Sequence, residues 1–391
     1  MKKTLAALAV LGAFAGSAAA ADVTLYGVVD YGFLYNYTDN QKADGTSTDD
    51  NTFGLQSGVD SGSRWGIKGV EDLGNGLKVG FQLESGFNAD DGTLSKYNEK
   101  QNRIFGRQAT LSVYSDFGTL TFGRMGALSS AAGTYDVVYS IGDAFDGGDN
   151  DVFGLYGASR YDNTVAYQSP KFAGLQVTTM YSFKQDSNVA KEKFSGDEGD
   201  FSSSKRYAGV ALTGEYGPAQ FVAAYELTKY GSNGTKRELD KDANVFFLGG
   251  NYDFGVAKVF AMGQYFNGLT TAPTLDDMLV SATDATGATV ATDGVKGFGF
   301  NVGTQVPAAG GLITVGGYYS NFEQDGVVAG KEKHEGDYYG LAARYEYDLS
   351  KRTMLYAGAG YGVESCDKVG TEKDDTENQL VQAYVGLTHR F

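Results

Sequence analysis

Apolar and polar residues alternate with a period of two along most of the chain after residue 20. In the segment 22–37 one parity is apolar and the other mostly polar, and the apolar set is Val23, Leu25, Val29, Tyr31 and Phe33. The segment 64–69 and the closing segment 378–391 repeat the pattern, with Arg64 and Lys68 on the polar face of the former. Such alternation predicts β-strands with one apolar and one polar face.

Two kinds of connection separate these segments. Seven are short and rich in tight-turn residues: 71–76, 116–118, 170–174, 216–218, 253–255, 307–311 and 348–352. Eight are long and polar: 38–58, 89–101, 125–159, 186–204, 231–242, 268–293, 324–336 and 365–377. Fifteen connections predict sixteen strands, each about 9–14 residues long, which is enough for a tilted strand to cross a membrane. An even strand number with short turns on one rim and long loops on the other favours an all-β, antiparallel transmembrane barrel over a soluble β-sandwich.

Composition supports an all-β membrane protein. The 391 residues include 27 Tyr, 24 Phe and 56 Gly but only 4 Pro. Aromatic rings gather near the predicted strand ends, where they suit the headgroup level of a bilayer. No apolar run of about 18 residues follows residue 20, so membrane-spanning helices are not expected. The mean hydropathy of −0.28 does not argue against a barrel, because lipid-facing and lumen-facing residues cancel in the average.

The first twenty residues form a separate unit. Lys2 and Lys3 precede an apolar run and a small-residue site that ends at Ala20, which predicts a cleaved secretory signal peptide over 1–20 and a barrel domain over 21–391. Cleavage removes two of the 32 basic residues and changes the formal charge from −16 to −18. A chain this acidic is not expected to bind nucleic acid.

The connection 125–159 is long, rich in Gly and Asp, and contains no Lys or Arg. Structureless segments of this length in compact domains are usually functional. We expect it to fold into the barrel as a constriction loop whose carboxylates face a basic wall. The candidate carboxylates are Asp136, Asp143, Asp146, Asp149 and Asp151. The alternative is a set of solvated carboxylates in a surface loop. The run 146–151 lacks the residue order of an EF-hand, so no metal is predicted.

Enzymatic chemistry has little support in the sequence. His334 and His389 are the only histidines, and neither has a nearby Ser or carboxylate spacing that favours a triad. Cys366 is the only cysteine, which excludes an intrachain disulfide, and its polar surroundings predict an incidental loop thiol. No catalytic residue and no cofactor is therefore expected. An outer-membrane hydrolase and a structural or adhesive protein are the alternatives to a channel, and single-channel conductance separates the three.

Several motifs resemble one family. They are Val23-Thr-Leu-Tyr-Gly-Val-Val-Asp30, Arg64-Trp-Gly-Ile-Lys-Gly-Val-Glu-Asp-Leu-Gly74, Phe105-Gly-Arg-Gln-Ala-Thr-Leu111, Phe117-Gly-Thr-Leu-Thr-Phe-Gly-Arg124, Asp162-Asn-Thr-Val-Ala-Tyr-Gln-Ser-Pro170 and Val385-Gly-Leu-Thr-His-Arg-Phe391. Together they resemble the general porins of Gram-negative outer membranes, most closely the neisserial and beta-proteobacterial branch.

This resemblance implies a homotrimer of sixteen-stranded barrels in outer-membrane lipid, each a water-filled passive channel for small hydrophilic solutes and ions, with the third loop folded inward. It also implies that Phe391 belongs to the signal read by the barrel-insertion machinery. The basic residues that it places on or near the pore wall are Arg64, Lys68, Arg107, Arg124 and Arg160.

Arg107 is a point where alternation and resemblance disagree. It shares the parity of Ala109, Leu111 and Val113, which predicts an outward side chain, whereas the resemblance turns it toward the lumen. We expect the lumen, because early strands of such trimers pack against neighbouring barrels, where the rule that outward residues are apolar is weakest.

Overall fold

The computed structural model describes residues 21–41, 45–95, 103–131, 133–187, 198–201, 203–232, 236–273, 281–283, 289–368 and 376–391. Within these ranges the chain forms strands and one short helix, α2. The strands are β1 (Ala21–Gln41), β2 (Ser47–Ser57), β3 (Arg64–Gly74), β4 (Leu77–Gly86), β5 (Gln108–Ser115), β6 (Gly118–Gly126), β7 (Arg160–Gln168), β8 (Leu175–Ser182), β9 (Arg206–Tyr216), β10 (Ala219–Lys229), β11 (Ala243–Asp253), β12 (Lys258–Leu269), β13 (Ala291–Ala308), β14 (Gly311–Val327), β15 (His334–Ser350), β16 (Thr353–Lys368) and β17 (Thr376–Arg390). The helix α2 is a single turn, Tyr139–Gly142.

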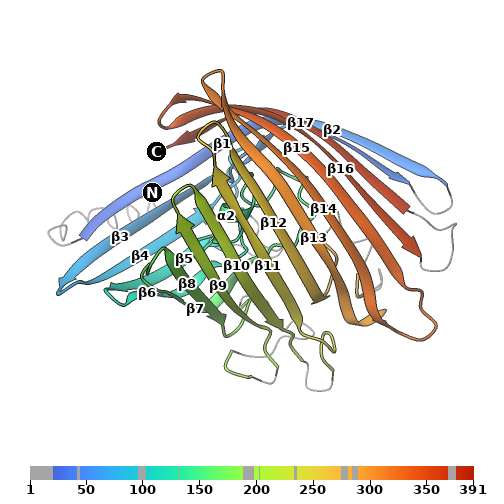
Figure 1. Cartoon of the computed structure of the whole chain (residues 1–391), viewed down its shortest axis with the longest axis horizontal. Helices are drawn as coiled ribbons and strands as arrows, with labels where there is room; N and C mark the ends of the chain where they lie inside the picture. The colour runs from blue at the N-terminus through green and yellow to red at the C-terminus, as the bar shows by residue number, and fades with distance from the viewer. Residues whose placement is uncertain are drawn as a thin grey trace, which may run out of the picture.

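The strands form one closed antiparallel barrel (Figure 1). Apart from β2 and β3, strands that follow one another in sequence pair in the wall, and β1 closes the barrel by pairing with β17 from Val28↔Arg390 to Gln41↔Glu377. The first part of β1 pairs with β3, and its later part pairs with β2. Since β2 and β3 lie one after the other along the same side of β1, they share one position in the wall, which leaves sixteen positions. The predicted sixteen-stranded barrel is confirmed.

The prediction of a loop over 38–58 was wrong. There β1 continues to Gln41 and β2 begins at Ser47, with regular pairing from Tyr31↔Ser57 to Gln41↔Ser47. Most of β2 is exposed, so polar residues occupy both faces of this hairpin. A strand of this kind has no apolar alternation and cannot be recognised by that criterion.

Other long connections are also shorter than predicted. The strand β14 extends to Val327 and β15 starts at His334. Cys366 lies inside β16 with 3% of its surface exposed, and its Sγ is 3.9 Å from Nδ1 of His334. The prediction of an incidental loop thiol was therefore wrong. All seven short turns fall where they were predicted; at 253–255, for example, Gly255 has φ +80° and donates its N–H to Asp253 Oδ1 at 2.7 Å.

The two faces of the wall differ as the alternation predicts. In β11, Phe246 and Leu248 are 50% and 69% exposed, whereas Val245 and Phe247 are buried. Outward positions such as Phe246 and Leu248 form an apolar belt, and inward positions carry polar or buried residues. Within the described residues, no helix is long and apolar enough to cross a membrane.

The buried apolar cluster lies inside the barrel and not between layers of sheet. Residues of the loop 125–159, including Met125, Leu128 and Val138, pack there against inward side chains of the wall such as Tyr207 and Phe247. The helix α2 contacts β10, β11 and β12, and Figure 1 shows it enclosed by the strands. The loop therefore occupies part of the lumen.

Candidate pore and its inward loop

Asp143 holds the loop 125–159 to the wall. Its Oδ2 accepts the N–H groups of Gly147 and Gly148 at 2.9 and 2.8 Å, which closes a turn within the loop. Its Oδ1 accepts the Tyr318 hydroxyl at 3.0 Å and the Asn301 amide at 3.2 Å. Only 2% of Asp143 is exposed, and burial raises the pKa of its carboxyl although the hydrogen bonds from Gly147, Gly148 and Tyr318 oppose the shift. Asp143 is an anchor and does not face open solvent.

Asp149 is a second anchor further along the loop. Its Oδ2 accepts the Tyr384 hydroxyl at 2.5 Å, and its backbone carbonyl accepts the Gln382 amide at 3.0 Å, so the loop is tied to β17. Arg344 of β15 lies 3.5 Å from Oδ1. Burial raises the pKa of Asp149 to about 6, while the Arg344 charge and the Tyr384 hydrogen bond act in the opposite direction.

Glu226 is a third anchor, contributed by the wall. Its carboxylate accepts the backbone N–H and hydroxyl of Ser129 at 3.0 and 2.7 Å and the Tyr207 hydroxyl at 2.6 Å. It is 2% exposed and shares the inward parity of Val222 and Ala224 in β10. The sequence analysis missed it. The sequence did carry a signal for it, because Glu226 is the one acidic residue among the apolar positions on that face of the strand.

The other three predicted carboxylates are more accessible. Asp136 is half-buried, whereas Asp146 and Asp151 are exposed. Asp146 adopts φ +57°, a left-handed conformation that Asp tolerates. Asp151 accepts the Asn36 amide of β1 at 3.5 Å. The five loop carboxylates thus divide into two buried anchors and three that solvent reaches.

Two of the predicted basic residues, Arg64 and Arg107, pair with Glu84 of β4, and Lys68 of β3 lies nearby over the Tyr26 ring. Arg107 Nε is 2.7 Å from Glu84 Oε1, and Arg64 Nε is 3.9 Å from Glu84 Oε2. Tyr26 donates its hydroxyl to Glu84 at 3.0 Å, and Lys68 Nζ lies 5.2 Å from the centre of the Tyr26 ring. We call Arg64, Lys68, Glu84 and Arg107 the basic cluster.

Arg107 joins this cluster because it precedes β5. The strand begins at Gln108, and its inward residues Gln108, Thr110 and Ser112 are buried. The alternation that assigned Arg107 an outward side chain holds only within a strand, so it does not apply one residue before the strand begins. Glu84, which binds Arg107, is 9% exposed at the end of β4.

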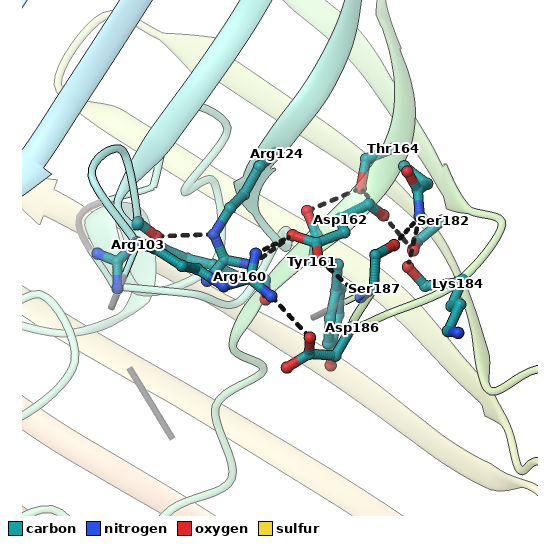
Figure 2. A network of polar contacts seen from close by, with 12 residues as sticks. Arg103, Arg124, Arg160, Tyr161, Asp162, Thr164, Ser182, Lys184, Asp186 and Ser187 are labelled. Atoms are coloured by element: carbon teal, nitrogen blue, oxygen red, sulfur yellow. Dashed lines mark hydrogen bonds and ion pairs between the residues drawn. The ribbon is translucent and has the colours of Figure 1, made fainter. Parts of the chain in front are cut away.

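Arg124 has different partners. Its Nη1 is 2.7 Å from Asp162 Oδ1, and its Nε donates to the Gly106 carbonyl at 2.7 Å. Arg103 also binds Asp162, at 2.7 Å, and reaches Asp186 at 2.6 Å. Figure 2 shows Arg103 and Arg124 converging on Asp162 near the start of β7, with Arg160 beside them. This cluster joins the segment before β5, strands β6 and β7, and the segment after β8.

Within the part of the chain that the structure describes, no hydrogen bond or ion pair joins Arg124 to a carboxylate of the loop 125–159. The side chains of Arg124 and Asp162 are only 10% and 9% exposed, and the Arg160 carbonyl accepts an N–H of Arg124 at 3.4 Å. Arg103 and Asp186 were not predicted as site residues. Their pairing spans 83 positions in the sequence, which alternation cannot reveal.

A second charged group lies on the wall beside Asp149. Arg344 Nη1 is 2.8 Å from Asp60 Oδ1, and its Nη2 is 3.2 Å from Glu346 Oε1. Asp60 in turn donates its N–H to Asp30 Oδ1 at 3.2 Å. The sequence analysis missed this group because its members come from β1, from the segment between β2 and β3, and from β15, which are far apart in the sequence.

An open space remains between the loop and the wall that carries the basic cluster. A cavity of about 560 Å³ is lined by Lys68 and Gln82 of β3 and β4, by Gln108, Thr110 and Ser112 of β5, and by Thr134 and Tyr135 of the loop. The lining also includes Val70, Phe81 and Tyr114, so hydroxyl, amide and ammonium groups stand beside aromatic and aliphatic side chains. Such a surface hydrates readily and can pass polar solutes without binding them strongly.

Comparison with known proteins finds similarity to porins. The profile described as "Gram-negative porin" matches residues 6–365. An outer membrane porin protein of Bordetella pertussis is 34% identical over the full length of both chains. Outer membrane porin protein 32 of Delftia acidovorans is 30% identical, with 92% of this chain and 89% of the relative covered. Among solved structures, the anion-selective porin from Comamonas acidovorans has a TM-score of 0.61 at 24% identity and covers 95% of this chain and 100% of its own.

Proposed function

The chain belongs to the Gram-negative porin family, and from this premise we propose that ions and small hydrophilic solutes pass between the constriction loop 125–159 and the basic cluster. The protein is an outer-membrane barrel that serves as a passive channel and not as an enzyme. The observation that carries the proposal is the cavity of about 560 Å³ between Tyr135 of the loop and Lys68 of the wall. Elsewhere the loop is bonded to the wall through Asp143, Asp149 and Glu226.

We propose that the basic cluster sets the local field of this passage. Arg64, Lys68 and Arg107 carry three positive charges against one negative charge on Glu84. A unit charge about 8 Å from a permeating ion contributes roughly 0.5 kcal/mol in water and about 2 kcal/mol at an effective dielectric of 20. Even the smaller value changes the cation-to-anion permeability ratio about fivefold, because one ion gains what the other loses.

The half-buried Asp136 and the exposed Asp146 and Asp151 supply the opposing charges in this proposal. Arg124 and Arg160 lie in the group of residues around Asp162 shown in Figure 2. We propose that Arg124 ties the end of β6 to the start of β7 through Asp162. It should affect ions in the passage less than Arg107 does. Asp143 and Asp149 hold the loop in place. Because they are buried, they do not contact permeating ions directly.

Reversal potentials across a salt gradient test this assignment. In planar bilayers, the double variant Arg64→Ser and Arg107→Ser is expected to shift toward cation preference, and the shift should shrink as salt rises, because the Debye length falls from about 10 Å at 0.1 M to about 3 Å at 1 M. Lys171→Ser is the matched control, since Lys171 is an exposed turn residue paired with Glu215. Equal reversal potentials in the double variant, the control and the wild type would refute the proposed pore wall.

We also propose that the protein assembles as a homotrimer in outer-membrane lipid after removal of residues 1–20. A closed barrel in a trimer leaves no free edge from which unfolding can begin. We therefore expect an oligomer that resists SDS and changes mobility on boiling, with a mature N-terminus at Ala21 by mass spectrometry. A monomer whose mobility is the same before and after heating would contradict the trimer.

Phe391 is the proposed assembly signal for the barrel-insertion machinery. Its N–H and carbonyl exchange two hydrogen bonds with Gly27 of β1, each at 3.1 Å. Its ring lies over Gly27, where a Cβ would be only 2.3 Å from the ring edge. Phe391 nevertheless keeps 45% of its surface exposed, so its side chain remains accessible while its backbone completes the closing pair of strands.

A further inference from the structure

Two strand glycines face open space on the outside of the barrel. A Cβ at Gly263 of β12 or Gly317 of β14 would meet no heavy atom closer than 3.9 Å. Gly317 pairs with Val302 on one side and Leu341 on the other, and these are 56% and 58% exposed. Because directly paired residues share a face, Gly317 lies on the outward face.

The missing side chain at Gly317 leaves a recess in the apolar belt. This recess has a volume of about 500 Å³, and its walls are Phe300, Val302, Tyr319, Tyr339, Leu341 and Tyr361. We call it the Gly317 recess. It spans β13 to β16, which lie side by side in the wall (Figure 1).

The aromatic walls of the recess support one another. The ring centres of Tyr319 lie 5.2 Å from Phe300 and 5.0 Å from Tyr339, the spacing of favourable aromatic pairs. The Tyr319 hydroxyl donates to Asp337 at 2.6 Å and is thereby satisfied. The recess therefore presents a largely apolar surface whose shape exists before anything binds.

The position of the recess indicates what fills it. Lys296 and Glu323 form an ion pair at 3.1 Å, and each lies six residues from the recess along its own strand, at Val302 and Gly317. Six residues span roughly 20 Å along a strand, which a tilt of about 35–45° reduces to roughly 15 Å along the bilayer normal, about half of the roughly 30 Å hydrocarbon core. An ion pair at this height marks the headgroup level on the side of the long loops, and the recess lies near the middle of the bilayer.

We propose that the Gly317 recess binds the terminal part of one acyl chain of a lipid in the leaflet on the long-loop side. Within a bilayer there is no hydrophobic gain in moving a chain from lipid to protein. The chain is held because an unfilled recess would lose dispersion contacts along its walls. Since the walls contact the chain and not the headgroup, retention depends on the chain.

The test uses a tryptophan reporter beside the recess. Phe298→Trp, on the outward face of β13, is introduced together with Trp65→Phe, which removes the one native Trp. The folded protein is reconstituted with phosphatidylcholine carrying bromines near the chain ends, and quenching is followed as the brominated fraction rises. At low brominated fractions, we expect quenching to be severalfold greater than the quenching that random contact with lipid would give.

Filling the recess should abolish this excess. Gly317→Leu occupies the space directly, and Val302→Phe fills it from the neighbouring strand if the first variant does not fold. Ala223→Leu introduces the same side chain on the face of β10 opposite the buried Val222 and Ala224, and should leave quenching and conductance unchanged. Quenching that already matches random contact in the Phe298→Trp reporter would overturn the proposal, as would a recess-filling variant that keeps the excess.

A second arm separates chain from headgroup. Brominated phosphatidylglycerol should give the same quenching curve as brominated phosphatidylcholine, and native mass spectrometry should find about one fewer retained lipid per protomer in Gly317→Leu. A preference that follows the headgroup and persists in Gly317→Leu would place the lipid at the ion pair of Lys296 and not in the recess. None of these outcomes depends on the ion selectivity of the pore.

Discussion

Replacing Asp143 by Asn tests whether hydrogen bonds hold the constriction loop in the lumen. The two carboxylate oxygens accept four donors, from Gly147, Gly148, Tyr318 and Asn301. An amide has one oxygen, so its NH₂ group must face two donors that no longer have an acceptor. A buried donor without a partner costs about 1–3 kcal/mol, and two at the lower limit give about 2 kcal/mol. That energy increases the displaced population of the loop about thirtyfold.

Single-channel recordings in planar bilayers measure this population directly. The Asp143→Asn channel should make frequent excursions to larger conductance levels, and liposomes that contain it should admit larger sugars. Asp146→Asn is the matched control: it removes the same charge from the same loop, but Asp146 is exposed and its φ of +57° suits Asn. If both variants show the same current noise and the same sugar exclusion limit, charge and not anchoring determines the loop's behaviour, and the reasoning fails.

The remaining predictions concern charge, pH and assembly. Arg107→Ser should shift the reversal potential toward cations several times more than Arg124→Ser. Arg124→Ser should lower the thermal stability more, because Arg124 ties β6 both to Asp162 and to the carbonyls of Gly106 and Arg160; equal shifts in the two variants would contradict this. The pKa of Asp149 is about 6, above its usual value of 3.8, so its contribution to stability is fully present below pH 3.8 and is lost as pH rises through 6. Single-channel recordings should therefore show fewer excursions to larger conductance levels at pH 5 than at pH 7, and Asp149→Asn should remove that difference. Deleting Phe391 should reduce the folded outer-membrane population far more than deleting the exposed turn residue Ala329, as measured by heat-modifiable mobility in SDS gels; equal folded amounts would count against the assembly signal.

The wall of the barrel could be predicted because strand alternation and turn formation depend on residues that are close together in the sequence. Alternation places Val23, Leu25 and Phe33 on the outward face, and all three are at least 44% exposed. Turn chemistry located every short connection for the same reason, since a turn such as 253–255 is determined by its own residues. Alternation failed where both faces are polar, as in β2, and just outside a strand, as at Arg107.

The division of the loop carboxylates could not be predicted. Asp143 and Asp146 are three residues apart in a segment without periodicity, yet one is buried and the other exposed. What separates them is the presence of Tyr318 and Asn301 on distant strands, at sequence separations of 175 and 158 residues. Glu226 was missed for the same reason, because its partner Ser129 lies 97 residues away.

The pairing of β1 with β17 has a consequence for the order of folding. It joins residues up to 362 positions apart, as in Val28↔Arg390, whereas Ser115↔Gly118 closes a hairpin of neighbours. By the usual logarithmic dependence on loop length, closing the longer interval costs about 4 kcal/mol more chain entropy than closing the hairpin. The seam therefore forms late, and until it forms the first strand keeps an unpaired edge that lipid cannot satisfy. In the proposed role of Phe391 as an assembly signal, a catalyst bound there would hold β17, the second half of the seam, beside the unpaired edge of β1.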